Sequence, residues 1–513
     1  MREEAAGNRG RAWRPDSGRP AGRARAAWAA PVAAVFLAVL LGACETRESI
    51  TRKRVRAVER GLLRAVFLKG LKPQKLALEN RMSFYRVPGV SLAVMDNYAT
   101  EWTRAYGFKR SDSEERVTTA TVFQAGPLSM PVAAALALRL AAEGGLDLQA
   151  DVEGRLGGWH IPWEKAGLES RRKVTPAALL SHSAGFPEAA LPEVRRGKPL
   201  PGLLDLLNGR VEGYELLFVP YLEEARNLVL SEPGYAVLER ALEEAGGKGY
   251  SELAREKILT PLGLERGTFD SVRLGEERVP DAASGHDRQG REVEGGWFYH
   301  SSQAAAGLWS NPSETLAFVE DLLASAMGRG GRLLSAEAAR AMLGPQTGRR
   351  SYGFLIEGSG TDVRVTMRGR TRGFTCALEV YPYKGQGAVI MANSDNGLIL
   401  ADEVLRALSA AYGWPDFKPL EKTPYRLDPS IYGQYVGRYE VGPGYALDIA
   451  HEDYYLVITP TGQAPTRFYA ESQSFFFSVD PYIRIQFLFD AGSNVRGLVL
   501  WQEDFKLEAK KAA

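Results

Sequence analysis

The spacing of hydrophobic and polar positions changes several times along the 513 residues, and each change predicts a different kind of element. Residues 45–75 are charged and helix-prone. Beyond them, Pro88–Asp96 and the run from Trp102 to Gly107 have the pattern of two strands in a hairpin. The alanine- and leucine-rich stretch after Pro127 predicts a helix that stops at Gly144–Gly145, because glycine accepts the backbone conformation that ends a helix.

The middle of the chain is helical, and strands return in its later part. Thr175–Pro187 and Gly234–Gly247 belong to the helical part. From Val363 onward, GFTCALEVYP and AVIMANSD predict two strands that a KGQG turn connects. Strands at both ends of this unit, with helices between them, predict a mixed sheet with a helical subdomain.

The last part of the chain has the pattern of an all-β unit. Phe417–Ser430 contains three prolines and little periodicity, so it is predicted to be a linker. After it, Tyr482–Phe489 alternates between apolar and polar positions, and AGSN makes the turn into GLVLWQ. These patterns divide the chain into a leader (1–44), a helical or flexible spacer (45–75), a large domain (76–415), a linker (416–430) and an all-β domain (431–513).

The leader has the order of a secretory signal. An arginine-rich stretch precedes Ala26–Ala43, which carries no charge, and LGAC ends the run at Cys44. LGAC resembles a bacterial lipobox, which implies a lipoprotein signal peptide over 1–44 and a lipid attached to Cys44. The alternative is an uncleaved membrane anchor, since Ala26–Ala43 is nearly long enough to cross a bilayer. We favour an exported, membrane-anchored lipoprotein that faces the periplasm or the cell surface.

Charge and composition narrow the function classes. Seven arginines against three acidic residues give residues 1–44 a net charge of +4, so the rest of the chain carries −2 of the total of +2. The basic excess belongs to the leader, and no nucleic-acid partner is expected. Cys376 is the only cysteine besides Cys44, so a lipidated chain has no disulfide. The histidines lack metal-ligand spacing, and no metal or other cofactor is predicted.

Seven segments between residues 77 and 415 carry a resemblance to a known family. They are FQAGPLSMPV, LLSHSAGFP, LSEPGYAVLE, ILTPLGLERGTF, AAAGLWSNPSE, MRGRTRGF and VIMANSDNG. In order and spacing they resemble the serine β-lactamase and penicillin-binding-protein family, in its class C and DD-peptidase-like branch. The β-rich tail resembles a small domain of unknown function that often follows such hydrolases. The resemblance implies an α/β (α+β) fold, with a mainly antiparallel sheet, a helical subdomain and a small all-β C-terminal domain.

The family's reaction uses a serine and, three residues later, a lysine at the start of a helix, where one turn places both on one face. Here those positions hold Pro127 and Met130. Pro127 also lacks the backbone N–H that the resemblance assigns to the oxyanion hole, and losing one such donor slows acyl transfer by about 10² to 10³. Ser129 is no substitute, because two residues along a helix turn it about 200° away from the nucleophile position.

The other two motifs of the family have changed as well. The second motif is a tyrosine that supports proton transfer, with asparagine or glycine two residues later. Here Leu230 takes the position of the tyrosine and Glu232 that of the asparagine or glycine. Glu232 is either an exposed carboxylate at a helix start or a group that activates water. The third motif, a lysine or histidine with glycine two residues later, is Met367 and Gly369.

New arginines accompany the third motif, and one histidine of the family is retained. Arg368, Arg370 and Arg372 are candidate ligand-binding residues, because guanidinium groups near a cleft can hold a carboxylate; the alternative is a solvated turn. His182 in LLSHSAGFP matches a family loop that supports the cleft, so we expect it to be structural.

Three substituted motifs inside otherwise matching segments point to a pseudoenzyme. We therefore expect an envelope lipoprotein that binds a peptidoglycan-like peptide, an apolar ligand or a protein partner without catalysis. Two alternatives stay open. One is a hydrolase of the β-lactamase, peptidase or esterase type with a displaced mechanism, for instance Glu232 acting on water. The other is a structural envelope protein that acts through its β-rich tail.

Overall fold

The computed structural model describes residues 46–166, 173–212, 214, 218, 230–270, 281–346, 348–502 and 505–512. The chain divides into two units, Met1–Lys53 and Arg54–Ala513. The leader with Cys44 lies outside the described residues, so the lipoprotein signal stays a prediction. Among the helices that the structure describes, none is long and apolar enough to cross a membrane.

A six-stranded sheet in the order β3-β2-β11-β10-β9-β8 forms the centre of the large domain. Its strands are β2 (Gly89–Asp96), β3 (Ala99–Gly107), β8 (Leu355–Glu357), β9 (Arg364–Thr371), β10 (Phe374–Tyr381) and β11 (Gln386–Ala392). Every neighbouring pair is antiparallel, so the sheet has none of the parallel pairs of a mixed sheet. The predicted hairpins are confirmed as β2–β3 and β10–β11.

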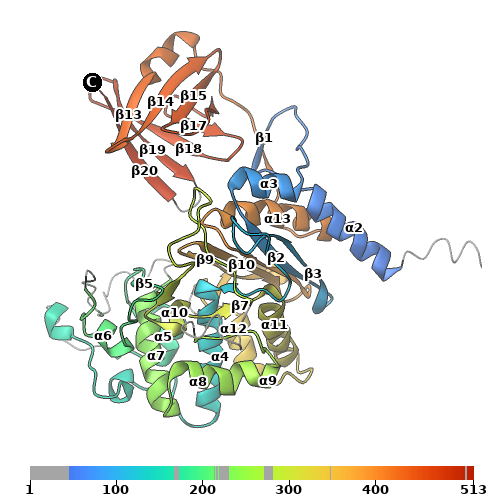
Figure 1. Cartoon of the computed structure of the whole chain (residues 1–513), viewed down its shortest axis with the longest axis vertical. Helices are drawn as coiled ribbons and strands as arrows, with labels where there is room; N and C mark the ends of the chain where they lie inside the picture. Colours follow the sequence, from blue (N-terminus) through green and yellow to red (C-terminus); the bar gives the residue numbers. More distant parts are fainter. Residues whose placement is uncertain are drawn as a thin grey trace, which may run out of the picture. The chain divides into compact units, whose positions relative to one another are not determined.

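Helices cover both faces of the sheet (Figure 1). Helix α13 (Gly397–Tyr412) packs on β10 and β11 and carries α3 (Leu78–Tyr85), while α11 (Pro312–Ala326) packs on the other face against β2, β3 and β11. The strand β2 is buried along nearly its whole length, and its side chains alternate between two cores. Ala93 and Met95 belong to the larger core, and Leu92 and Val94 belong to the smaller one.

The helical subdomain contributes most of the larger core. Its helices are α4 (Ser129–Ala142), α5 (Pro176–Leu180), α6 (Leu203–Leu207), α7 (Glu232–Gly246), α8 (Tyr250–Ala254), α9 (Thr260–Leu262), α10 (Gln303–Ala306) and α12 (Ala336–Leu343). The predicted stop at Gly144–Gly145 is confirmed, because α4 ends at Ala142, and Gly247 likewise closes α7 with a φ of 67°. Two short antiparallel pairs complete the domain, β4 (Phe123–Gln124) with β7 (Trp309–Ser310) and β5 (Glu193–Arg195) with β6 (Phe298–His300).

The segments on either side of the large domain are ordered against each other. Helix α2 (Arg47–Arg60) places Val55 and Val58 in the smaller core. Strand β1 (Val66–Leu68) then pairs in parallel with β12 (Leu420–Lys422), which lies in the segment predicted to be a linker. Residues 54–75 and the linker are therefore part of the folded unit, a feature that their charge and prolines did not reveal.

The C-terminal domain is a closed eight-stranded barrel. Its strands are β13 (Gly437–Gly442), β14 (Tyr445–Glu452), β15 (Tyr455–Pro460), β16 (Thr466–Ala470), β17 (Phe475–Ser478), β18 (Arg484–Phe489), β19 (Val495–Gln502) and β20 (Phe505–Lys511). A short helix, Pro429–Tyr435, supplies Tyr432 and Tyr435 to its core, and their hydroxyls donate to the carbonyls of Tyr454 and Gln473 at 2.8 and 2.6 Å. Aromatic and aliphatic side chains together fill this core.

Candidate functional site

The first and third family motifs meet in the folded chain. Gly126–Leu128 form a 3₁₀ turn that leads into α4, and Gly126 has a φ of 49°. A β-carbon on Gly369 would lie only 2.4 Å from Cγ of Pro127, which means that the proline ring is packed directly on the backbone of β9. The space between the nucleophile position and the third motif is thus occupied by the proline ring.

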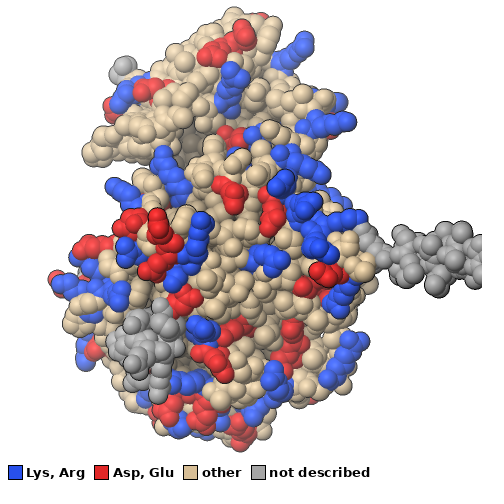
Figure 2. All heavy atoms as spheres, turned by 45° about the vertical axis from the view of Figure 1, so that its right-hand side comes forward, with Lys and Arg blue, Asp and Glu red and all other residues tan. Residues whose placement is uncertain are grey.

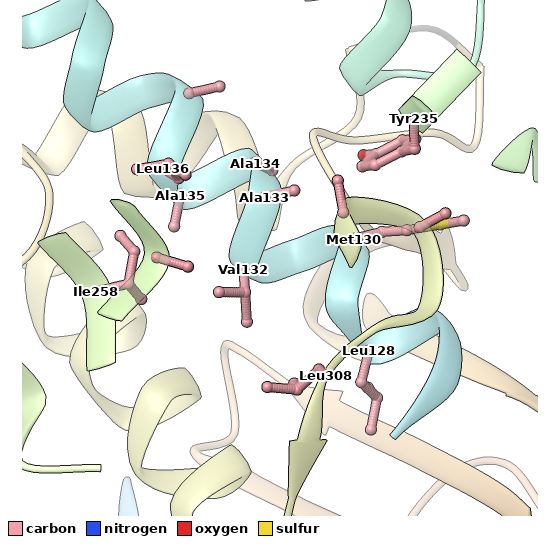
Figure 3. Packing of buried hydrophobic residues seen from close by; sticks show 14 of the residues in the cluster. Leu128, Met130, Val132, Ala133, Ala134, Ala135, Leu136, Tyr235, Ile258 and Leu308 are labelled. Atoms are coloured by element: carbon pink, nitrogen blue, oxygen red, sulfur yellow. The ribbon is translucent and has the colours of Figure 1, made fainter. Parts of the chain in front are cut away.

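The two methionines at reactive positions are part of the larger core. Met130 is 1% exposed and Met367 is 0% exposed. Figure 3 shows Met130 at the first turn of α4, on the side that faces Tyr235 of α7. Apolar side chains with this burial contribute packing energy, but they offer no group for nucleophilic attack or proton transfer.

The hydroxyl of Ser129 both donates and accepts a hydrogen bond, and these bonds stabilise the turn around Pro127. Its Oγ donates to the carbonyl of Gly126 at 2.6 Å and accepts from the N–H of Leu308 at 2.9 Å. The side chain is 0% exposed. Ser129 therefore points away from the nucleophile position, as the helix geometry predicts, and it ties the turn to the start of β7.

A buried cysteine lies beneath the same turn. The Sγ of Cys376 on β10 donates to the carbonyl of Ala125 at 3.1 Å, and Cys376 pairs in register with Gly369 on β9. Burial raises the pKa of this thiol to about 12, although the N–H groups of Leu128 and Gly369 oppose the shift. The thiol stays protonated and is no replacement nucleophile. Sequence reasoning placed Cys376 in a strand but had no signal for its position under the turn.

Leu230 and Glu232 flank the cap of helix α7. Leu230 is half-buried against the larger core, and Ser231 caps the helix by accepting from the N–H of Gly234 at 3.1 Å. Glu232 is half-buried and accepts from the N–H of Leu191 at 2.8 Å. Burial raises the pKa of Glu232 to about 7. The carboxylate is therefore not the exposed group expected at a helix start, because the loop around Leu191 folds against it.

The three arginines near the third motif do not share one ligand position. The side chain of Arg368 contacts Asp402 of α13 at 2.5 Å, on the sheet face opposite to Met367. Arg372 contacts Glu193 of β5 at 3.2 Å, and Arg370 is exposed at the end of β9. The structure thus brings Arg372 together with Glu193, a carboxylate that the sequence did not single out.

His182 connects the family loop to the start of helix α7. The residue has a φ of 51°, and its Nδ1 accepts from the N–H of Ser231 at 3.1 Å. Its ring stacks on Tyr235 with 4.9 Å between centroids. Burial lowers the pKa of His182 to about 3, so the imidazole is neutral at neutral pH. These contacts give it the structural role expected from the sequence.

This burial predicts acid sensitivity. The unfolded chain protonates His182 below pH ~6.5, whereas the folded chain resists protonation until about pH 3, so its stability contribution is full above pH ~6.5 and falls as the pH drops below that value. We expect His182→Asn, which keeps an acceptor and tolerates a positive φ, to lose about 2 kcal/mol less stability than the wild type between pH 7 and pH 5. Melting curves of both proteins at several pH values measure the difference. Parallel pH profiles would contradict the prediction.

The described residues were compared with the requirements of a metal site, and the charge on the molecular surface was compared with that of a binding patch. Within the described ranges, no group of three His, Cys, Asp or Glu side chains is arranged to hold a metal ion. Figure 2 shows basic and acidic side chains mixed over the face that it displays.

Comparison with known proteins gives matches along most of the chain. Residues 76–411 match the Beta-lactamase family. Penicillin-binding protein 4* of Bacillus subtilis (strain 168) is 20% identical over 428 residues, which cover 79% of this chain and 91% of that protein. Penicillin-binding protein 4 of Amycolatopsis lactamdurans is 30% identical over 203 residues, or 38% of this chain and 47% of that protein.

A solved structure shares the fold. The octameric penicillin-binding protein homologue from Pyrococcus abyssi aligns with a TM-score of 0.55 at 19% identity, over 84% of this chain and 98% of that one. The matched span includes every family position discussed above, from Pro127 to Gly369.

Proposed function

The chain belongs to the beta-lactamase family, and on that premise we propose that its large domain binds a ligand or a partner and does not carry out the family's acyl transfer. One observation carries the proposal: the ring of Pro127 is packed on Gly369, and Met130 and Met367 are buried in the larger core. The positions of the nucleophile, the general base and the cation therefore hold no group that attacks a substrate or moves a proton.

The expected loss of rate is large, because these groups act together. Pro127 removes both the hydroxyl and one oxyanion-hole N–H, and that N–H alone is worth about 10² to 10³ in rate. Removing one member of a catalytic unit costs nearly as much as removing the whole unit, so no partial activity is expected from the remaining positions.

The same substitutions are compatible with a stable, binding-competent domain. Proline suits the first turn of a helix, where its missing N–H would have no partner. Methionine fills the volume of a lysine stem without burying a charge. Met130, Leu230 and Met367 replace the polar and cationic groups that would hold a β-lactam. Of the three, only Leu230 is half-buried rather than buried, so an apolar group or a side chain of a protein partner would contact this region through Leu230. A peptidoglycan-like peptide is the second ligand class that we propose, because the relatives are penicillin-binding proteins by name.

We also propose that the protein is exported and held at a membrane by lipid on Cys44, facing the periplasm or the cell surface. LGAC at the end of the uncharged run Ala26–Ala43, behind an arginine-rich stretch, supports this location.

Exposure to β-lactams tests the loss of catalysis. We expect no covalent adduct with a fluorescent penicillin, and no hydrolysis of a chromogenic cephalosporin above the buffer control, because the serine position is Pro127. Labelling gels and intact-mass spectra measure this outcome, with an active penicillin-binding protein as the positive control. A stable acyl adduct mapped to any serine of this domain would refute the proposal.

A displaced hydrolase is the second candidate, and the environment of Glu232 favours it. A carboxyl with a pKa near 7, next to the former tyrosine position, has the protonation range of a general base at neutral pH. An activity on peptides or esters that Glu232→Gln abolishes would support this function.

Action through the barrel is the third candidate. Because buried apolar side chains, Tyr432 and Tyr435 among them, fill the barrel core, a partner would have to contact its outer surface or its loops. Pull-down experiments with and without residues 431–513 distinguish a partner of the barrel from a partner of the large domain.

A further inference from the structure

Residues 54–75 carry a charge opposite in sign to that of the chain that follows them. Seven basic residues against Glu59 give this segment a net charge of +6. Residues 1–44 carry +4 and residues 45–53 carry +1, which leaves −9 of the chain's total of +2 for residues 76–513. A change of sign of this kind favours an anionic partner for the basic segment.

The single carboxylate of the segment and two of its basic groups contact the folded body. Glu59 of α2 accepts from a tyrosine hydroxyl of β3 at 3.0 Å. Arg54 contacts Asp96 at 2.8 Å, and Arg64 contacts Asp480 at 2.8 Å. Because these contacts hold the carboxylate against the body, the charged groups that the segment presents to solvent are basic.

Five basic side chains of the segment are exposed, and together they are called the basic surface below. They come from the end of α2 and from the loop between β1 and α3: Arg56, Arg60, Lys69, Lys72 and Lys75. In the part of the chain that the structure describes, no carboxylate forms an ion pair with them. Arg56 and Arg60 are also one helical turn apart, where like charges repel each other. The protein therefore supplies no counter-charge for this surface.

Backbone hydrogen bonds hold the loop next to the end of α2. The N–H of Leu62, two residues beyond the helix, donates to the carbonyl of Leu76 at 2.9 Å, and the N–H of Leu76 donates back to Leu62 at the same distance. Between Lys69 and Lys72 the loop presents Leu71, which is 61% exposed. Basic groups around an exposed apolar side chain suit the headgroup region of a membrane, where the charges meet phosphate and the apolar group leaves water.

The leader ends a short distance along the chain from this surface. Cys44, the proposed site of the lipid, precedes Arg54 by ten residues. Ten residues reach about 35 Å when fully extended, and about 20 Å with α2 helical from Arg47. An uncleaved anchor through Ala26–Ala43 would end at the same place in the chain. Either form of membrane attachment therefore brings the basic surface near lipid headgroups.

We propose that the basic surface binds the anionic headgroups of the membrane to which the leader attaches the chain. This inference rests on the proposed membrane location and adds an orientation to it, with the end of α2 and the loop after β1 facing the bilayer. Phosphate oxygens are the acceptors that these guanidinium and ammonium groups lack within the protein. The net charge of −9 on residues 76–513 is repelled by the same lipids, which favours the same orientation.

Energy transfer from the protein to labelled lipids measures how close this surface lies to the bilayer. Gln74→Cys places a thiol for a donor dye in the exposed loop without changing its charge, since Cys376 is buried and its pKa is raised to about 12. The full chain is added to vesicles with an acceptor dye on their headgroups. Transfer should be at least about twofold higher with about one third phosphatidylglycerol in phosphatidylcholine than with phosphatidylcholine alone, because the anionic lipid attracts the basic surface. About 1 M NaCl should remove this difference, because the Debye length falls to about 3 Å.

Two quadruple variants with the same loss of charge assign the effect to the basic surface. The test variant is Arg56→Gln, Arg60→Gln, Lys69→Gln and Lys75→Gln. The control variant changes four exposed residues of the helical subdomain: Arg155→Gln, Lys165→Gln, Lys198→Gln and Arg255→Gln. The test variant should lose the preference for anionic vesicles, and the control should keep it. Melting temperatures of both should stay within a few degrees of the wild type, since exposed substitutions cost little stability.

Sedimentation with the neutral vesicles measures the membrane anchor alone, so failure of the anchor is distinguished from failure of the basic surface. A chain that sediments only with the anionic vesicles lacks the anchor and still supports the proposal. Equal transfer on neutral and anionic vesicles would overturn it and leave an acidic protein as the partner of this surface. The same loss of preference in both quadruple variants would overturn it as well, because total charge rather than these five residues would then be responsible.

Discussion

Restoring the four family residues, through Pro127→Ser, Met130→Lys, Leu230→Tyr and Met367→His, is expected to lower the melting temperature by about 5 °C or more and to give at most weak acylation by β-lactams. If only the reactive groups had been lost, restoring them would rebuild an active site on an intact frame. If neighbouring side chains have repacked around the replacements, the restored polar side chains would no longer fit.

Packing at three of these positions indicates that the site has repacked around the substituted residues. Lysine in place of Met130, which is 1% exposed, would lose its hydration, so its pKa would fall and the fold would lose several kcal/mol. Histidine in place of Met367 meets the same problem at a position that is 0% exposed. Serine in place of Pro127 removes the ring that is packed on Gly369 and leaves an unfilled space.

A control variant with apolar residues at the same four positions separates the effect of changed side-chain volume on stability from the effect of added polar groups. Pro127→Ala removes the proline ring as serine does, whereas Met130→Leu, Leu230→Met and Met367→Leu are apolar exchanges of similar size that cost less than about 1.5 kcal/mol each. This variant therefore keeps the loss of volume at position 127 and adds no polar group at any of the four positions. Thermal denaturation and penicillin labelling of both quadruple variants measure the outcome. Wild-type stability of the restored protein together with clear labelling would mean that the frame is still a working hydrolase scaffold.

Replacement of Cys44 by alanine is expected to release the protein from membranes or to leave its precursor uncut. The sequence LGAC ends an uncharged run behind arginines, and each buried methylene of an attached acyl chain adds about 0.8 kcal/mol of membrane affinity. Removing the proposed attachment point should therefore move most of the protein to the soluble fraction, or keep residues 1–43 on the chain.

The other cysteine supplies the control for this experiment. Cys376 is 2% exposed inside β10, so Cys376→Ala should leave membrane association unchanged. Fractionation, metabolic labelling with a fatty acid and intact-mass analysis measure the result. A wild-type mass that still includes residues 1–43 would show that Cys44 is not the mature N-terminus.

Some features of the candidate site could be predicted from the sequence, and others could not. The spacing of the motifs identified Pro127, Met130, Leu230 and Met367 as the occupants of the reactive positions, because family motifs are local and keep their spacing. The structural role of His182 followed from its place in a family loop, whereas the burial of Met130 and Met367 was found only in the structure. The half-buried state of Glu232 did not, because it depends on the distant N–H of Leu191.

The sequence by itself determined the two hairpins of the central sheet, the helical middle, the β-rich C-terminal domain and the residues at the family's reactive positions, since periodicity and motif spacing are properties of neighbouring residues. Only the tertiary structure decided that the ring of Pro127 rests on Gly369, that Arg368 points to Asp402, and that the barrel closes. Each of these depends on strand register and on packing between distant segments, and the pattern of hydrophobic and polar positions along the chain specifies neither.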